Sequence, residues 1–211
     1  MIERPNLLAG EDLPPEPRQK RSIEKRVRLK QSALALFGER GFEGTSIEEI
    51  AARAGLAVGG FYQHFRSKRQ LLLVLMNDLL EALSRLDFRL QADGTARDVL
   101  HELLARAFAR DFQYLGAYRA WQEAMMADTG LARKNQEIHA WTTARVMAVF
   151  KMLQQMSGSR AEVDIPGLAR AMDTFFWSLL AQALHMKKTE LDRWIDAATH
   201  LIYHALFRDQ P

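Results

Sequence analysis

The chain of 211 residues contains no cysteine and only six prolines. The absence of cysteine excludes disulfides, zinc sites built on thiolates and cysteine nucleophiles. Four of the six prolines fall within the first 17 residues, which show no hydrophobic periodicity. Because this composition is typical of a flexible tail, we predict such a tail over residues 1–17.

Long hydrophobic runs are also missing. The clearest uninterrupted run, Leu71–Met76, has six residues, whereas a membrane-spanning helix needs about 20. Prolines and acidic residues interrupt the start of the chain, so that it lacks the apolar core of a secretory signal. The sequence therefore predicts a cytoplasmic protein with no membrane partner. Its 48% hydrophobic and 26% charged residues are ordinary for a folded globular chain.

The excess positive charge is confined to one block. Residues 1–17 contain one basic and four acidic side chains, residues 18–68 contain eleven and five, and residues 69–211 contain seventeen of each. The net charge of +3 thus combines an acidic start, a basic block of +6 and a neutral remainder. Such a block indicates contact with nucleic acid or an anionic membrane, and the alternative is a solvated helix face.

Hydrophobic residues recur at helical spacing from about Arg18 onward, and no sustained alternation indicates strands. The sequence therefore predicts an all-α fold of about nine helices. They are expected at residues 21–40, as two short helices within 46–65, from Ser67 through Leu83, and at 96–113, 116–127, 131–156, 166–187 and 189–207.

The two short helices have the pattern of a helix-turn-helix. Thr45 and Ser46 each stand three residues before a glutamate, the spacing of a capping box that opens a helix. Gly55 then breaks this helix, and the next one can begin near Ala57. Because small residues at the corner let the helices cross closely, the second helix can project into a major groove.

The segment TSIEEIAARAGLAVGGFYQHFRSK, residues 45–68, resembles the TetR (TetR/AcrR) family of bacterial transcriptional regulators. The resemblance covers about residues 24–75. The matching residues are Thr45, Ile50-Ala51, Ala54-Gly55, Gly59, Tyr62, His64-Phe65 and Lys68.

The resemblance implies a helix-turn-helix DNA-binding domain at 18–68 and a ligand-binding and dimerisation domain at 69–211. It implies a homodimer on a palindromic operator in double-stranded DNA. A small molecule in the C-terminal domain would change the separation of the two recognition helices. Most members of the family repress transcription and are released from DNA by their ligand.

Nine positions are candidates for DNA contact. Hydroxyls at the helix start and the Tyr, His and Lys side chains suit phosphates, and glutamine can read adenine. In the family pattern the tyrosine contacts phosphate and Phe65 is a core residue; from the residues alone, both Tyr62 and Phe65 can equally be core. The candidates are Thr45, Ser46, Ala57, Val58, Gly60, Tyr62, Gln63, His64 and Lys68.

Two departures from the family pattern affect the recognition helix. Ala57 stands where the family often has a capping Ser or Thr, and Gly60 adjoins Gly59. The glycine pair costs up to about 2 kcal/mol of helix propensity relative to alanine. Ala57, Val58 and Gly60 offer only apolar contact with thymine methyls and close backbone approach. Sequence discrimination is therefore expected to depend partly on DNA shape.

A basic run precedes the first helix. Arg18, Lys20 and Arg21 can form an arm that follows the DNA backbone or enters a minor groove. The alternative is a solvated extension that contacts nothing.

The C-terminal part is rich in large apolar side chains. Ten of the 19 aromatic residues lie between Phe108 and Trp177, and seven of the nine methionines lie between Met125 and Met186. This composition suits an apolar ligand cavity, although any single aromatic residue is more often core. His139 and Arg145 can orient a polar group. The ligand-binding candidates are Phe112, Trp121, Met125, Trp141 and Phe175.

The last two predicted helices carry wide apolar faces that can form a four-helix bundle across a two-fold axis. The alternative is that both complete the core of one chain. His200 and His204 are spaced as a possible metal pair, but no third ligand is evident, so no metal or other cofactor is expected.

Three functions remain open from the sequence. The first is a ligand-responsive DNA-binding regulator, most simply a repressor. The second is a helical small-molecule-binding protein whose DNA reading is weak or lost. An enzyme ranks last, because the sequence has no cysteine, phosphate loop, clear metal set or nucleophile motif.

Overall fold

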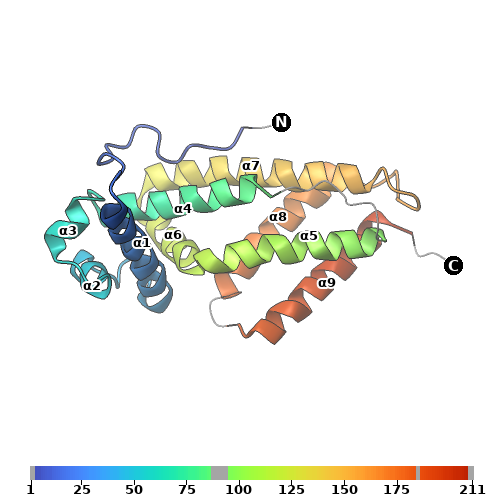
Figure 1. Cartoon of the computed structure of the whole chain (residues 1–211). Coiled ribbons are helices and arrows are strands. Elements are labelled where there is room, and N and C mark those ends of the chain that lie inside the picture. Colours follow the sequence, from blue (N-terminus) through green and yellow to red (C-terminus); the bar gives the residue numbers. More distant parts are fainter. Residues whose placement is uncertain (1–2, 87–94, 184–185, 209–211) are drawn as a thin grey trace. The chain divides into compact units, whose positions relative to one another are not determined.

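The computed structural model describes residues 3–86, 95–183 and 186–208. Over these residues the regular structure is helical, as predicted, apart from one isolated antiparallel bridge between Ser159 and Phe207 (Figure 1). Within the same residues, no helix is both long and apolar enough to cross a bilayer. The helices are α1 (Lys20–Arg40), α2 (Ile47–Arg53), α3 (Val58–Tyr62), α4 (Lys68–Ser84), α5 (Ala96–Asp111), the 3-10 turn η1 (Phe112–Tyr114), α6 (Leu115–Ala127), α7 (Thr129–Leu153), α8 (Ile165–Gln182) and α9 (Lys188–Leu206).

The chain folds into two compact units. We call Pro5–Glu81 with Tyr114–Gln136 the N-terminal unit, and Met1–Arg4 with Ala82–Gln113 and Glu137–Pro211 the C-terminal unit. These units do not follow the boundary predicted between residues 68 and 69. Most of α4, all of α6 and the start of α7 pack with the helix-turn-helix instead.

Packing of α6 against α1 explains this difference. At Gly116 in α6, an added Cβ atom would lie 1.9 Å from the carbonyl oxygen of Leu34. Gly116 therefore permits close contact between α1 and α6, because it has no Cβ atom. Arg119 donates to the carbonyl oxygen of Gly38 at 2.8 Å, and the Glu123 carboxylate accepts from the Phe42 amide at 2.6 Å. Both bonds hold α6 to the C-terminal end of α1.

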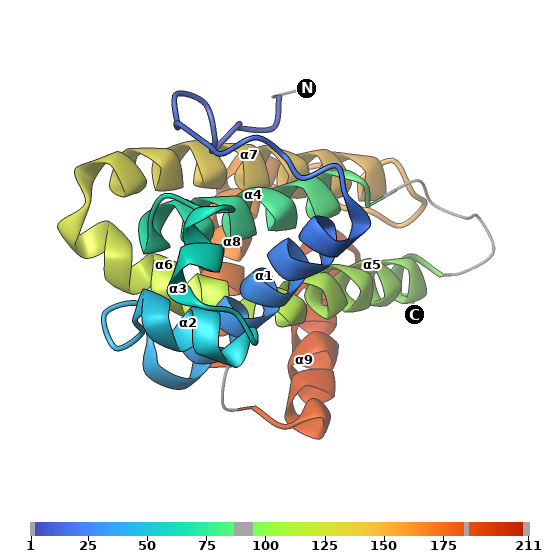
Figure 2. The same ribbon diagram turned by 60° about the vertical axis from the view of Figure 1, so that its left-hand side comes forward.

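The core of the N-terminal unit is built on one face of α1. Leu29, Ala33, Leu36 and Phe37 are all buried. Gly41 ends the helix with φ +76°, and its amide donates to the Phe37 carbonyl at 2.9 Å. Figure 2 shows α2 and α3 beside the C-terminal end of α1. The same packing buries six consecutive residues of α4, from Leu71 to Met76, and this accounts for the longest apolar run in the sequence.

The flexible tail predicted over residues 1–17 is wrong for much of its length. Leu7 is fully buried and Pro14 is buried. Glu11 pairs with Arg69 at 2.9 Å, and the carbonyl oxygen of Asp12 accepts from Gln70 at 2.9 Å. The proline content indicated only that the segment is irregular. One buried leucine and a few polar bonds are enough to attach such an irregular segment to a helical surface. We call residues 5–17 the strap.

In the C-terminal unit, α5 packs along α9. Ile195, Ala198 and Ile202 are buried, so much of the apolar face predicted on α9 completes the core of its own chain. Asp164 opens α8 by accepting from the Gly167 amide at 3.2 Å. The helix ends at Gln182, five residues before the predicted end.

Candidate nucleic-acid interface

Thr45 and Ser46, the two hydroxyl residues predicted to contact phosphate at the start of α2, have different surroundings in the structure. Ser46 forms the predicted capping box: its hydroxyl accepts from the Glu49 amide at 3.1 Å, and the Glu49 carboxylate accepts from the Ser46 amide at 2.9 Å. The bond from the Ser46 amide lowers the pKa of Glu49. Thr45 is only 1% exposed and donates its hydroxyl to the Gly41 carbonyl at 2.7 Å. Thr45 therefore fixes the loop, and Ser46 stays half-buried at the helix start.

The recognition helix α3 has one buried side and one exposed side. Phe61 is fully buried, and its ring lies 5.7 Å from that of Phe65, which is equally buried. Tyr62 is 48% exposed, so of the two aromatic residues that the sequence left open as core, Phe65 is buried in the core and Tyr62 is not. The other predicted contacts on α3 lie at the surface or are half-buried. Ala57 and Gln63 are exposed, and Val58 and Gly60 are half-buried.

Lys68 is engaged within the fold. Its amine donates to the carbonyl oxygens of Phe42 at 2.5 Å and Thr45 at 2.8 Å, and lies 4.3 Å from the centroid of the Phe42 ring. These bonds tie the first turn of α4 to the loop before α2. The side chain thus positions the helix-turn-helix, in addition to the phosphate contact that the resemblance implies.

His64 is buried, at 3% exposure, and its Nε2 has no hydrogen-bond partner. Burial, together with the positive charges of Arg26 and Lys25, lowers the pKa of His64. A neutral buried imidazole is a poor direct contact for a phosphate. Its backbone has a clearer role, because Arg26 donates to the His64 carbonyl at 3.1 Å and stacks over the Phe65 ring at 4.7 Å.

Sequence reasoning missed Arg26 and Glu123 as supports of this surface. Arg26 holds the backbone at His64, just after α3, and Glu123 holds the loop after α1. Neither lies within the helix-turn-helix, and only the tertiary fold brings them to it. The one available signal was the density of arginine and lysine in the first turns of α1.

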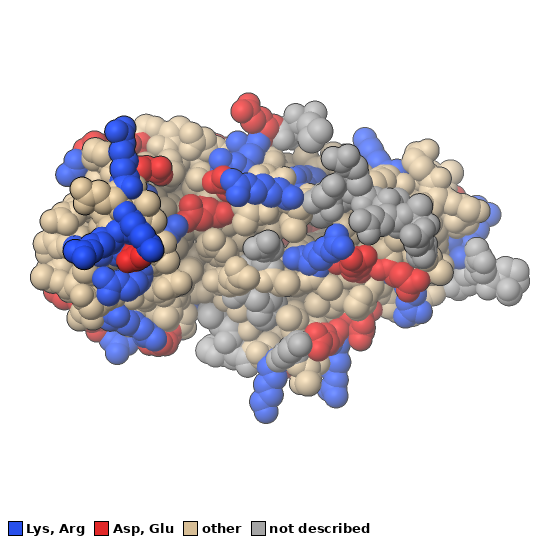
Figure 3. Space-filling view, in the orientation of Figure 1, with Lys and Arg blue, Asp and Glu red and all other residues tan. Residues whose placement is uncertain are grey.

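Basic side chains gather over α1 in the space-filling view of Figure 3. Arg18, Lys20, Arg21 and Arg28 are exposed. The positive block inferred from the sequence is therefore a surface that a phosphate backbone can approach.

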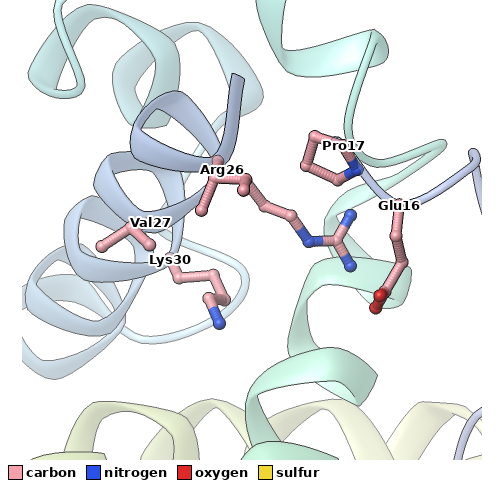
Figure 4. Close-up of a pocket in the computed structure, with 6 residues that line it drawn as sticks. Glu16, Pro17, Arg26, Val27 and Lys30 are labelled. Carbon is pink, nitrogen blue, oxygen red and sulfur yellow. The ribbon is translucent and has the colours of Figure 1, made fainter. Parts of the chain in front are cut away.

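A pocket of about 250 Å³ lies between α1 and the strap. Figure 4 shows Glu16 and Pro17 on one side and α1 on the other, with the Arg26 side chain extending between them. Lys30, which also lines the pocket, pairs with Asp78 at 2.8 Å. Ile23 and Val27 complete the lining and are 45% and 40% exposed, so the strap does not close over α1 here.

Residues 31–75 match the family model described as bacterial regulatory proteins, tetR family. The matched region includes the whole helix-turn-helix and the first turns of α4. The chain belongs to the TetR family.

Two curated relatives match this N-terminal part of the TetR-family chain. It is 46% identical over 50 residues to YerO of Bacillus subtilis, an uncharacterized HTH-type transcriptional regulator. These residues make up 24% of this chain and 17% of that protein. It is 35% identical over 70 residues to the HTH-type transcriptional repressor KstR2 of Mycolicibacterium smegmatis. These residues make up 33% of this chain and 32% of that protein. The chain therefore matches less than half of the length of either relative.

Solved structures extend the likeness to most of the fold. The ketosteroid transcriptional regulator KstR2 of Mycobacterium tuberculosis superposes with a TM-score of 0.65 at 17% identity, covering 88% of this chain and 96% of that one. A TetR family transcriptional regulator from Pseudomonas syringae gives a TM-score of 0.62 at 24% identity, covering 88% and 98%. At these identities the comparisons show the same fold.

The five predicted ligand contacts of the TetR-family chain are divided between the units. Trp121 and Met125 belong to the N-terminal unit, whereas Trp141 and Phe175 belong to the C-terminal unit. The side chain of Phe112 lies outside the described residues. Trp121 is fully buried and donates its indole N–H to Asn135 at 2.9 Å, as a core residue does.

The C-terminal unit holds a polar pair among aromatic side chains. His139 bonds through Nδ1 to the carboxylate of Asp173 at 2.9 Å, and its ring lies 4.7 Å from that of Trp177. Asp173 is only 4% exposed. Arg145 stacks over Trp141 at 4.9 Å and donates to the Leu83 carbonyl at 2.8 Å. Burial lowers the pKa of Arg145.

The rings of His200 and His204 lie 4.2 Å apart on α9. Among the residues that the structure describes, no group of three or more metal-ligating side chains gathers there or elsewhere.

Proposed function

We propose that this TetR-family chain is a transcriptional repressor that binds a palindromic duplex as a homodimer and leaves it when a small, largely apolar molecule binds. The repressor KstR2 is among its relatives, which supports the sign of regulation. Because relatives of this kind are named as regulators, a regulatory role is favoured over an enzymatic one.

The observation that carries the proposal is the division of α3 into two sides. Phe61 and Phe65 anchor the helix in the core, while Tyr62, Gln63 and Ala57 remain at the surface next to a basic face. This arrangement can present a helix to a major groove while lysine and arginine side chains meet the phosphates.

Duplex selection tests the proposal. The purified chain is mixed with a library of random duplexes, and bound DNA is recovered and sequenced over several rounds. We expect enrichment of an inverted repeat, with affinity that falls steeply as salt concentration rises. Recovery of no preferred sequence would overturn the proposal.

The effector site is assigned by this proposal to the C-terminal unit, near Trp141 and Phe175. The His139–Asp173 pair gives that region a polar contact within apolar surroundings. A compound that binds there should raise the melting temperature. It should also weaken duplex binding by the same factor by which the duplex weakens binding of the compound. A stabilising compound that leaves duplex affinity unchanged would contradict release by ligand.

A second candidate is a helical small-molecule-binding protein with weak DNA reading. It is favoured by α3 itself, which has five residues including Gly59 and Gly60 and offers Gln63 as the main polar group for base edges. The selection experiment distinguishes the two, because this protein would bind duplexes weakly and without sequence preference while still binding apolar compounds.

A further inference from the structure

The strap is fixed to the N-terminal unit at one end. Leu7 is fully buried, and Glu11, whose side chain is 19% exposed, pairs with Arg69 at 2.9 Å. Arg69 also pairs with Asp128 at 2.6 Å, so the strap joins an ion network that includes the start of α7. Burial by itself would raise the pKa of Asp128, but the bonds to Arg69 and to backbone amides together lower it. This half of the strap is part of the fold.

The other half of the strap places acidic groups beside the candidate interface. Asp12 lies 3.6 Å from Arg66, four residues beyond the exposed Tyr62. The Asp12 side chain is 90% exposed and that of Arg66 is 55% exposed. Glu16 lines the open pocket of Figure 4 together with Arg26 and Lys30. Both acids thus face cations on the surface that a duplex would approach.

We propose that the outer half of the strap, residues 12–17, is an acidic screen that lowers the affinity of this surface for any duplex. The inference rests on the proposed function. Asp12 competes with phosphate for Arg66, and Glu16 reduces the positive potential over the first turns of α1. The screen limits sequence-independent binding and leaves the base-facing side of α3 untouched.

Asp12 and Glu16 contribute little to the stability of the fold. An ion pair at 3.6 Å between exposed side chains contributes little to folding. The open pocket shows that Glu16 is not packed against α1. The buried Leu7 and the Glu11–Arg69 ion pair hold the strap. Asp12 and Glu16 mainly alter the electrostatic field that a polyanion meets.

The experiment compares the full chain with the double variant Asp12→Asn, Glu16→Gln. Each binds a labelled duplex of random sequence, about 30 base pairs long, in fluorescence anisotropy titrations over a range of salt. The double variant is expected to bind about fivefold more tightly at ~50 mM salt and within about twofold of the unchanged chain at ~300 mM, because screening shortens the reach of the removed charges. Freeing Arg66 should also steepen the slope of log K against log salt by about one.

A matched control removes two acids from another exposed surface. Glu102→Gln, Glu137→Gln changes the net charge equally, and the two residues are exposed on α5 and α7. The control should change affinity by less than about twofold, because Glu102 pairs with Arg106 on α5 and not with a cation of the candidate interface. Equal affinity of the strap variant and the unchanged chain, or an equal gain in the control, would overturn the screen.

The same titrations separate this inference from the proposed function. If the unchanged chain binds no duplex at any salt concentration, the proposed function fails and the screen fails with it. If the unchanged chain binds but the strap variant gains nothing, only the screen fails. Melting temperatures of the three proteins should agree within a few degrees, so that a change in duplex affinity reports charge and not unfolding.

Discussion

Tyr62 and Lys68 lie six residues apart and have different surroundings. The phenol ring is half exposed, whereas the Lys68 amine already bonds two carbonyl oxygens. Tyr62→Phe should weaken duplex binding by about threefold to tenfold through loss of one hydrogen bond, and should change the free energy of unfolding by less than about 0.5 kcal/mol. Anisotropy titration and urea unfolding measure the two effects.

Lys68→Met provides the comparison. It should lower the free energy of unfolding by about 1–3 kcal/mol, because two carbonyl oxygens lose their donor. If Lys68→Met leaves unfolding unchanged and weakens only duplex binding, the side chain is a phosphate contact alone and the positioning role is wrong.

His64 gives the N-terminal unit a pH-dependent stability. Its pKa is lowered in the fold by burial and by Arg26 and Lys25. The unfolded chain takes up a proton near the usual value of 6.5, so below that pH the unfolded state binds more protons and stability falls. This loss is at most about 1.4 kcal/mol per pH unit for one proton.

The variant His64→Phe removes both the titration and the unpartnered Nε2. Urea unfolding at about pH 7.5 and about pH 5.5 should show a smaller loss of stability in the variant than in the unchanged chain. An identical loss in both proteins would assign the pH dependence to other groups.

The chemistry of the site residues was readable in part from the sequence. Spacing identified the Ser46 capping box and the end of α1 at residue 40, because both depend on neighbours a few residues away. The burial of Thr45 and His64 was not readable, because it depends on helices far along the chain. Residue type alone suggested phosphate contacts for both.

At the level of helices, the packing of α6 against α1 depends on Gly116. An alanine at position 116 would gain about 1 kcal/mol of helix propensity. Its Cβ atom would, however, meet the Leu34 carbonyl oxygen at 1.9 Å and the Gly38 nitrogen at 2.9 Å, and both are backbone atoms. Gly116→Ala should therefore lower the free energy of unfolding by about 1–3 kcal/mol. Urea unfolding measures it.

Gly130→Ala at the start of α7 is the matched control. Its added Cβ atom would meet only the ends of two side chains, at 3.1 Å and 3.3 Å. Stability at this position should change much less than at Gly116. A Gly116→Ala chain as stable as the unchanged one would show that α1 and α6 can separate at little cost.

At the level of the whole molecule, we predict that α8 and α9 form the dimer interface. Leu201 is 57% exposed on α9, and the exposed side of α8 carries the small residues Ala171, Thr174, Ser178 and Ala181. Leu201→Glu should weaken dimerisation at least about tenfold, because a carboxylate would face its symmetry mate across a two-fold axis. Sedimentation velocity over a range of concentrations measures the change.

Ala148→Glu, at an exposed position on α7, is the control for the added charge. It should leave the dimer intact. If Leu201→Glu sediments as the unchanged chain does, or if both variants dissociate alike, the assignment of the interface to α9 is wrong.

The sequence by itself determined the helical class, the corner of the helix-turn-helix and the family, because hydrophobic spacing, caps and a short motif are local properties. The tertiary structure decided which residues form each compact unit, that the strap is packed, and that Lys68 and His64 face inward. These outcomes depend on contacts between distant segments, such as Gly116 with Leu34 and Glu11 with Arg69. The spacing of residues along the chain does not predict such contacts, because they form only when the helices pack.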